Sequence, residues 1–152
     1  MLEFGKYNAN PKGKKTGDCV VRALSVAMNK DYEVVMRDLF ELGLKKGFTF
    51  NDQRTYEAYL LEHGWIKVPQ PRKKDKSWYR ISDLDQFVSN WQTTIVTTTG
   101  HVAAKVGNVI VDTFDCRQKF IGNYFINSNE SPINILGNVQ VNFAPTQSRR
   151  IL

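Results

Sequence analysis

The segment HVAAKVGNVIVD, residues 101–112, has the pattern of a β-hairpin. Two apolar runs rich in Val flank Gly107-Asn108, and such a pair between strand-forming runs is typical of a two-residue turn. A turn at this pair fixes the register of the hairpin. Asp112 then becomes a diagonal neighbour of His101 on the same face, about 7–8 Å away at Cβ, a separation that an imidazole and a carboxylate can bridge.

The same register decides between two candidate acids. Asp115 would lie opposite Gly100 and on the reverse side of the sheet, unless a bulge intervenes. Asp112 is therefore the residue that we expect to orient His101.

Further strands are predicted on both sides of this hairpin. Residues 93–99 are β-branched nearly throughout, and residues 124–127 and 139–143 are shorter strand candidates. The last residues, 146–152, have the composition of a loose tail. The second half of the chain is therefore expected to be a sheet.

Helical patterns occupy the first half. Apolar residues recur at helical spacing in three stretches, and Asp31 is a plausible N-cap for the second. In the second stretch, the predicted buried stripe is Val34, Val35, Leu39 and Leu42. We expect helices over residues 18–28, from the cap Asp31 to near Gly43 or Gly47, and over residues 52–63 before Gly64.

Irregular segments and short elements separate these helices and strands. Residues 5–17, which include three Gly and one Pro, are typical of a loop. Residues 65–68 should form a short strand, and Ser82 should cap a brief helix through Val88. Helices thus precede antiparallel strands, which predicts the α+β class and a single domain over residues 1–152, with a helical part at about 18–90 and a sheet part at about 93–145.

Composition limits the classes of protein that fit. The 152 residues suffice for one core, and no apolar run approaches the about 20 residues of a membrane span. The first four residues lack a basic region followed by an apolar stretch, so we expect no secretory signal and a cytoplasmic setting. Cys19 and Cys116 should be free thiols, and we expect neither a metal nor another cofactor.

The formal net charge of +6 permits attraction to nucleic acid or to an acidic protein. Basic residues cluster at Lys12-Gly13-Lys14-Lys15, Arg72-Lys73-Lys74 and Arg149-Arg150. The clusters lie beside Pro and Gly and are not interleaved with aromatic residues on one strand or helix. A solvated loop is therefore the simpler interpretation of each, and nucleic acid is only a possible partner.

Cys19 lies at the predicted first turn of a helix, where backbone N–H groups favour the thiolate. Nucleophilic acyl transfer needs such a thiol, a histidine that takes its proton and an acid that fixes the tautomer of the histidine. The backbone N–H of Cys19 can face the developing oxyanion, and Asn8 or Asn10 could supply a second donor. Alternatively, Cys19 packs the helix and His101 is a surface residue at a strand end.

Three other residues have less specific predicted roles. His63 lies before Gly64, where a cation suits the terminal carbonyls of a helix. Cys116 is expected to be a structural or incidental thiol. Arg22 lies one turn below Cys19 and is expected to pair with an acid or a helix carbonyl, although it could also bind a substrate carboxylate.

The motifs resemble those of the papain-like cysteine peptidase superfamily in its small bacterial and phage forms. Gly17-Asp18-Cys19 opens an apolar helix, and residues 100–104 (GHVAA) and 109–113 (VIVDT) follow about eighty residues later. The resemblance covers residues 16–115 and implies a papain-like fold with Cys19, His101 and Asp112 as the triad. Many papain-like enzymes have a Gln about six residues before the cysteine, whereas Gly13 stands there in this chain.

Two functions from different classes follow. The first is a papain-like thiol hydrolase that acts on a peptide, isopeptide or related amide bond of a peptide or protein substrate. The second is a non-catalytic binding module on the same fold, which would use its basic surface to bind a host protein or nucleic acid. A phage-encoded protein of either kind would act in the host cytoplasm.

Overall fold

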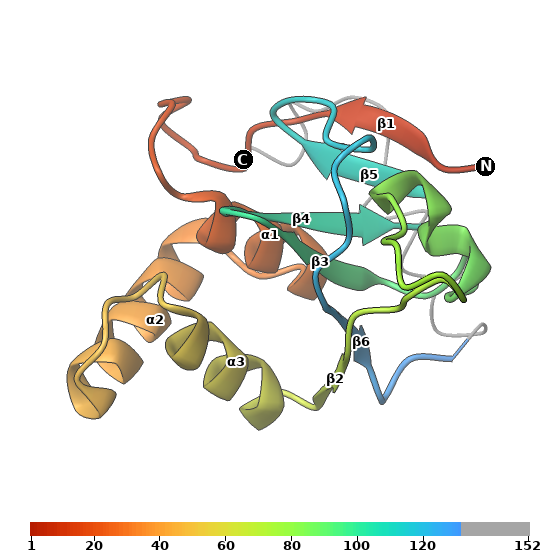
Figure 1. The fold of residues 1–152 in the computed structure, drawn as a ribbon. Helices are drawn as coiled ribbons and strands as arrows, with labels where there is room; N and C mark the ends of the chain where they lie inside the picture. Colours follow the sequence, from red (N-terminus) through yellow and green to blue (C-terminus); the bar gives the residue numbers. More distant parts are fainter. Residues whose placement is uncertain (132–152) are drawn as a thin grey trace.

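The predicted hairpin lies near the middle of the sheet in the computed structural model, which describes residues 1–131 (Figure 1). Strands β4 (His101–Val106) and β5 (Val109–Asp112) are antiparallel, with Val106 opposite Val109. Gly107 opens the turn with a φ of +59°, a conformation that favours glycine. The register predicted from the turn is therefore confirmed.

Six strands form one sheet in the order β1-β5-β4-β3-β6-β2. Every neighbouring pair is antiparallel except β1 and β5, which are parallel, so the sheet is mixed. The strands predicted at residues 93–99, 124–127 and 65–68 are present. They are β3 (Thr94–Thr98), β6 (Tyr124–Asn127) and β2 (Trp65–Val68).

Strand β1 (Glu3–Lys6) corrects two predictions, namely that helices precede all strands and that the segment from residue 5 onwards is entirely loop. With four residues and a central Gly5, β1 is too short for an alternating pattern to be visible. Its pairing with β5 forms it: the N–H of Glu3 donates to the carbonyl of Asn108, and that of Tyr7 donates to the carbonyl of Asp112. The first strand of the chain therefore pairs with the strand that carries Asp112.

Three helices occur where helical spacing predicts them, and they are α1 (Cys19–Met28), α2 (Tyr32–Lys46) and α3 (Gln53–Glu62). The carboxylates of Asp31 and Asp52 accept hydrogen bonds from backbone N–H groups in the first turns of α2 and α3. Gly47, with a φ of +84°, ends α2. The predicted N-cap Asp31 is confirmed, Gly47 is the one of the two candidate glycines that ends the helix, and the third helix starts after Asp52 as predicted.

The buried stripe predicted for α2 is partly wrong. Val35 and Leu39 are fully buried, but Val34 is 37% exposed and Leu42 is only partly buried. Because α2 packs against α1 and α3 on a narrow face, the neighbouring apolar positions remain at the surface.

The brief helix expected from Ser82 also differs from the prediction. It is a 3₁₀-helix, η1 (Ile81–Gln86), whose N-cap is Arg80, two residues before Ser82, and it ends before Val88. The carboxylate of Asp83 accepts a hydrogen bond from the backbone N–H of Arg80 at 2.9 Å. This carboxylate takes the capping role that the sequence suggested for Ser82.

Two clusters of buried side chains lie on opposite faces of the sheet. The first joins α1, α2 and α3 to residues such as Val102 and Val111. The second joins η1 and the segment after β5 to the alternate positions, such as Ala103 and Ile110. As Figure 1 shows, the start of β4, the end of β5 and the start of α1 lie at one edge of this layered structure.

Within residues 1–131, no helix is long and apolar enough to cross a membrane. The strand predicted at residues 139–143, the tail at 146–152 and the basic pair Arg149-Arg150 lie outside the described residues, as does the end of the predicted sheet part.

Candidate active site

Cys19 is the first residue of α1 and is partly exposed. The loop that precedes it is held by short-range hydrogen bonds: the Asn8 side chain accepts from the N–H of Asn10, and the Asn10 side chain accepts from the N–H of Lys12. Gly13 has a φ of +66°, which completes the turn. These polar residues explain why an irregular stretch delivers Cys19 to a fixed position.

His101 and Asp112 meet at the open end of the hairpin. Nε2 of His101 lies 2.6 Å from Oδ2 of Asp112, and the two side chains are 10% and 2% exposed. His101 begins β4 and Asp112 ends β5, so the turn at Gly107 sets this pairing from six and five residues away. The contact predicted from the register is present.

The Cys19 thiol hydrogen-bonds to the His101 side chain and to the backbone of Val102. Burial alone would raise the pKa of the thiol. The hydrogen bonds from His101 and Val102 and the positive charges of His101 and Arg22 outweigh burial, and the pKa of Cys19 lies below its ordinary value.

The pKa of His101 is shifted in the opposite direction to that of Cys19. Burial lowers the pKa of the imidazole, but its hydrogen bonds to Asp112, Cys116 and Cys19 raise the pKa to about 11. Because Nε2 is bonded to Asp112, Nδ1 is the ring nitrogen left to exchange a proton with the sulfur. The two shifts together favour a thiolate beside an imidazolium.

Arg22 ties the start of α1 to the end of β5. Its Nε donates to Oδ1 of Asp18 at 2.8 Å, and its Nη1 donates to Oδ1 of Asp112 at 2.9 Å. Tyr32 donates to the other oxygen of Asp18 at 2.6 Å. The prediction that Arg22 pairs with an acid is therefore confirmed, with two acids instead of one.

Both oxygens of the Asp112 carboxylate have hydrogen-bond partners. Oδ2 faces His101, while Oδ1 accepts from Arg22 and from the backbone N–H of Thr113 at 2.7 Å. Burial raises the pKa of this carboxyl, but the His101 hydrogen bond and charge, the Thr113 N–H and Arg22 outweigh it and lower the pKa. Asp112 is thus held as a carboxylate with a fixed orientation.

Two residues that the sequence did not predict to lie here are neighbours of this group. Cys116 is 1% exposed, and its Sγ lies 3.5 Å from Oδ2 of Asp112. Burial raises the pKa of this second thiol, so it remains protonated and can donate. Phe114 packs against the ring of His101 with a centroid distance of 4.8 Å. Only the turn after β5 brings these residues back to the site.

The two asparagines proposed as oxyanion donors have different hydrogen-bond partners. The side-chain nitrogen of Asn8 donates to the carbonyl of Lys14. That of Asn10, which is buried, donates to Asp18, the residue before Cys19. Asn10 is therefore the better placed of the two.

Asp115 and His63 lie apart from the group. Asp115 is exposed and pairs with Arg117 at 2.8 Å. His63 is the C-cap residue of α3, and its Nδ1 lies 2.7 Å from the carbonyl of Tyr59, which confirms the predicted capping role.

A metal does not suit the cluster. His101, Asp112 and Cys116 offer ligand atoms within 4.8 Å of one another. However, Asp112 already binds the imidazole and the guanidinium of Arg22, whose positive charge opposes a cation at this place. The donor set fits a hydrogen-bonded pair better than a coordination shell.

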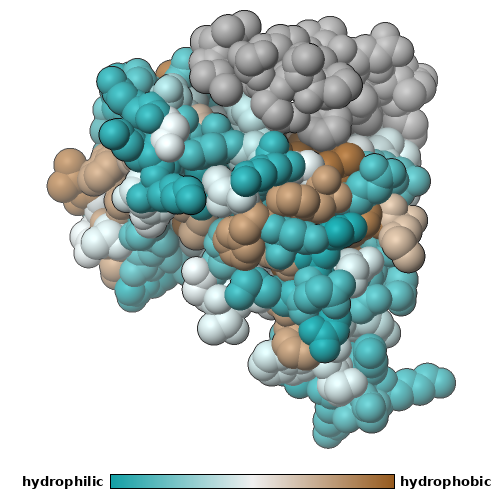
Figure 2. Space-filling view, turned by 90° about the horizontal axis from the view of Figure 1, so that it is seen from above, coloured by the Kyte–Doolittle hydropathy of each residue, from teal (hydrophilic) through white to brown (hydrophobic). Residues whose placement is uncertain are grey.

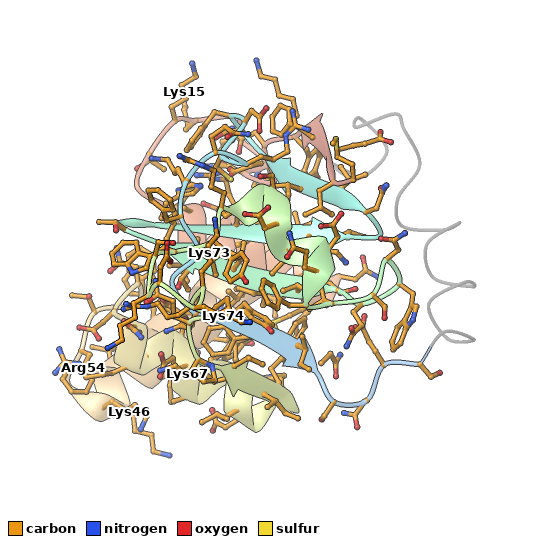
Figure 3. All side chains as sticks on the ribbon, turned by 45° about the vertical axis from the view of Figure 1, so that its right-hand side comes forward. Lys15, Lys46, Arg54, Lys67, Lys73 and Lys74 are labelled. Atoms are coloured by element: carbon orange, nitrogen blue, oxygen red, sulfur yellow. The ribbon has the colours of Figure 1, made fainter. Side chains whose placement is uncertain are left out.

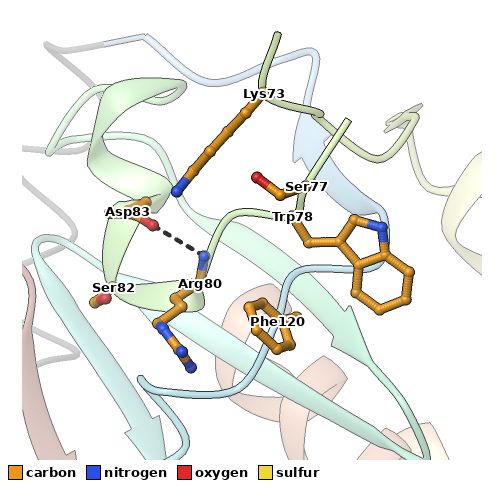
Figure 4. A pocket seen from close by; sticks show the side chains of 7 residues that line it. All are labelled: Lys73, Ser77, Trp78, Arg80, Ser82, Asp83 and Phe120. Carbon is orange, nitrogen blue, oxygen red and sulfur yellow. Dashed lines mark hydrogen bonds between the residues drawn. The ribbon is translucent and has the colours of Figure 1, made fainter. Parts of the chain in front are cut away.

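A cavity of about 610 Å³ lies beside η1 and is drawn in Figure 4. Trp78 and Phe120, each a little over 40% exposed, form one part of its wall and meet edge to face at 5.8 Å. Lys73 and Arg80 line it as well, and the guanidinium of Arg80 lies over the ring of Phe120 at 4.5 Å. The fold thus places the predicted basic cluster at 72–74 beside aromatic rings.

No protein-family model, curated protein or solved structure matches this chain significantly. The geometry of the site and the arrangement of the fold are therefore the grounds for assigning a function. The papain-like resemblance of the motifs around Cys19 and His101 accordingly remains a proposal.

Proposed function

We propose that this protein is a thiol hydrolase that cleaves a peptide, isopeptide or related amide bond, with Cys19 as nucleophile, His101 as base and Asp112 as orienting acid. The chain of hydrogen bonds from Cys19 through His101 to Asp112 supports this function. The lowered pKa of the thiol and the raised pKa of the imidazole favour an ion pair, which a cysteine that only packs a helix has no reason to form.

In the proposed reaction, the thiolate of Cys19 attacks the carbonyl carbon and forms a C–S bond, while the carbonyl electrons move to the oxygen. His101 donates its Nδ1 proton to the leaving nitrogen as the C–N bond breaks. Water then attacks the thioester carbon and gives a proton to His101, and the C–S bond breaks, which releases the acid product and restores the Cys19 thiolate beside the His101 imidazolium. Asp112 supports the imidazolium throughout and is not itself protonated.

The oxyanion would face the backbone N–H of Cys19, which lies at the start of α1 where helix N–H groups have no partner within the helix. Asn10 is our candidate for the second donor, since its side-chain nitrogen lies beside Asp18 and has a second hydrogen to offer. This donor would take the place of the Gln found in many papain-like enzymes.

The arrangement also agrees with a papain-like fold. A cysteine begins a helix that packs on the sheet, and the histidine and the acid come later in the chain from adjacent strands. The parallel strand β1 is an addition to the antiparallel sheet that the resemblance implies.

A peptide library prepared by digesting a proteome tests the function without knowledge of the substrate. Incubation with the protein is expected to produce new peptide termini, identified by mass spectrometry, because the ion pair can attack an accessible amide. Cys19→Ala should produce none, whereas Cys116→Ser should retain cleavage. New termini that appear equally with Cys19→Ala would contradict the assignment.

A binding module is the second candidate, and the cavity in Figure 4 favours it. Exposed Trp78 and Phe120 beside Lys73 and Arg80 combine aromatic surface with positive charge, the pairing by which single-stranded nucleic acid is bound.

If that is the main role, an oligonucleotide should bind at about 50 mM salt, weaken steeply as salt rises and bind Cys19→Ala equally well, because phosphate contacts release counterions and need no thiol. Fluorescence anisotropy measures this, with Lys73→Gln/Arg80→Gln as the variant that should lose affinity. A protein with no affinity at low salt would leave the binding role with protein partners alone.

A further inference from the structure

A second cavity, of about 340 Å³, is lined by residues that neighbour the proposed triad. It borders the loop that leads into α1 and the segment that follows β5. Its wall includes Asp18, which precedes Cys19, and Arg22, which contacts Asp112. Phe114, which packs on His101, closes another part of the wall. The triad itself does not line the cavity, but one wall residue precedes Cys19 and two others contact Asp112 and His101, so a group bound here would lie one side chain away from the triad.

Positive charge dominates this cavity. Lys6, Lys14 and Lys15 line it, and within residues 1–131 none of the three belongs to an ion pair. Asp18 is the one acid in the wall, and Arg22 already pairs with it. The uncompensated charges create a field that attracts an anion and repels a cation.

The rest of the wall suits a peptide better than an apolar partner. Asn8, Thr16 and Thr113 add hydrogen-bonding groups, and Phe114 is 43% exposed. The face over β1 and β5, seen from above in Figure 2, is mostly hydrophilic, with smaller hydrophobic patches between. A chain with an acidic side chain and a flanking apolar group complements such a surface.

We propose that this cavity binds a carboxylate of the substrate, so that the enzyme prefers acidic residues close to the bond it cleaves. This inference rests on the proposed hydrolase function for its substrate, but the anion site itself does not need hydrolysis to be detected. Lys14 and Lys15 are specificity-determining residues in this account, since they belong to the loop that delivers Cys19. The small size of the cavity and its single exposed ring favour an acidic peptide over nucleic acid.

Two alkylating reagents that differ in charge test the site. Iodoacetate and iodoacetamide both form an S–C bond with the thiolate and release iodide, but only iodoacetate is an anion. The rate ratio at Cys19, iodoacetate over iodoacetamide, is expected to exceed that of the neutral thiol 2-mercaptoethanol. In Lys14→Gln/Lys15→Gln this ratio should fall about three- to tenfold at low salt, and the difference should shrink as salt screens the lysines.

Lys73→Gln/Lys74→Gln is the matched control, because Figure 3 shows Lys73 and Lys74 well apart from Lys15. This pair removes the same charge and should leave the ratio unchanged. An unchanged ratio in Lys14→Gln/Lys15→Gln, or an equal fall in the control pair, would overturn the anion site.

A competition experiment identifies the class of ligand. A poly-glutamate peptide should slow the reaction of iodoacetate with Cys19 more than an oligonucleotide of equal charge, and the reverse order would overturn the assignment to acidic peptides.

The peptide library separates the anion site from the hydrolase function. Acidic residues should be enriched near the new termini, and cleavage without that enrichment counts against the preference. A library left uncut while the alkylation ratio responds to Lys14 and Lys15 refutes cleavage of peptide bonds and supports the anion site.

Discussion

Asp112→Asn is expected to lower the turnover of any amide substrate by about 10²–10⁴, the upper value being the loss known for the same change in a serine triad. The new side chain has the same shape, but its orientation is dictated by its neighbours. Arg22 and the N–H of Thr113 both donate to Oδ1, so the oxygen of the amide must stay there. The amide nitrogen then faces Nε2 of His101 as a donor.

This contact forces the wrong tautomer on the histidine. Nε2 must accept, the proton moves to Nδ1, and the nitrogen that faces Cys19 can no longer take the thiol proton. The size of the loss is measured as kcat/KM on the peptides identified from the library. Asp115→Asn is the matched control, since Asp115 pairs with Arg117 at the surface, and its turnover should match wild type.

Loss of activity in Asp115→Asn, together with wild-type activity in Asp112→Asn, would show that the wrong acid has been assigned. Asn is preferable to Ala at this position, because its oxygen can still accept the hydrogen bonds of Arg22 and Thr113, whereas Ala would leave the guanidinium of Arg22, whose side chain is only 11% exposed, without an acceptor here. The isosteric change separates an effect on the tautomer from an effect on folding.

The His101–Asp112 pair was predictable because a two-residue turn, which local sequence reveals, fixes the pairing of both strands that it joins. Gly107-Asn108 fixes the register, and a register of period two decides which side chains share a face. The position of Cys19 followed in the same way from the apolar spacing of α1 and the residues that precede it.

Strand β1 could not be predicted, since its four residues include a glycine and form a strand only by pairing with β5. The glycine has a packing reason: a Cβ on Gly5 would lie 3.0 Å from a methyl group of Val109. Such a constraint comes from a partner more than a hundred residues away, and no pattern within the segment reveals it.

The surroundings of the site were hidden for a similar reason. Arg22 joins Asp18 to Asp112 across 90 residues of chain, and the turn after β5 folds Cys116 beneath the same carboxylate. Spacing on α1 places Arg22 near Cys19 but does not say which acid it meets. Contacts of this kind follow from the tertiary fold and not from local propensity.

The central claim is that Cys19 and His101 form a thiolate–imidazolium pair. An ordinary thiol with a pKa of about 8.5 has well under about 1% thiolate at about pH 6, and only the thiolate is alkylated. The pKa of Cys19 is lowered. Its thiolate therefore persists when the pH falls below the pKa of an ordinary thiol, and it is lost only when the pH falls below the pKa of Cys19 itself. The pKa of Cys116 is raised by burial, which keeps it protonated.

The direct measurement is the rate of iodoacetamide alkylation of each cysteine at about pH 6, followed by peptide mass spectrometry in wild type and in His101→Ala. Cys19 of the wild type is expected to react at least about tenfold faster than Cys116 and than 2-mercaptoethanol, since each unit of pKa lowering is worth about tenfold in thiolate. His101→Ala should abolish this advantage while the slow rate of Cys116 persists. Equal rates for the two thiols in the wild type, or a Cys19 rate unchanged by His101→Ala, would contradict the ion pair and with it the proposed enzyme.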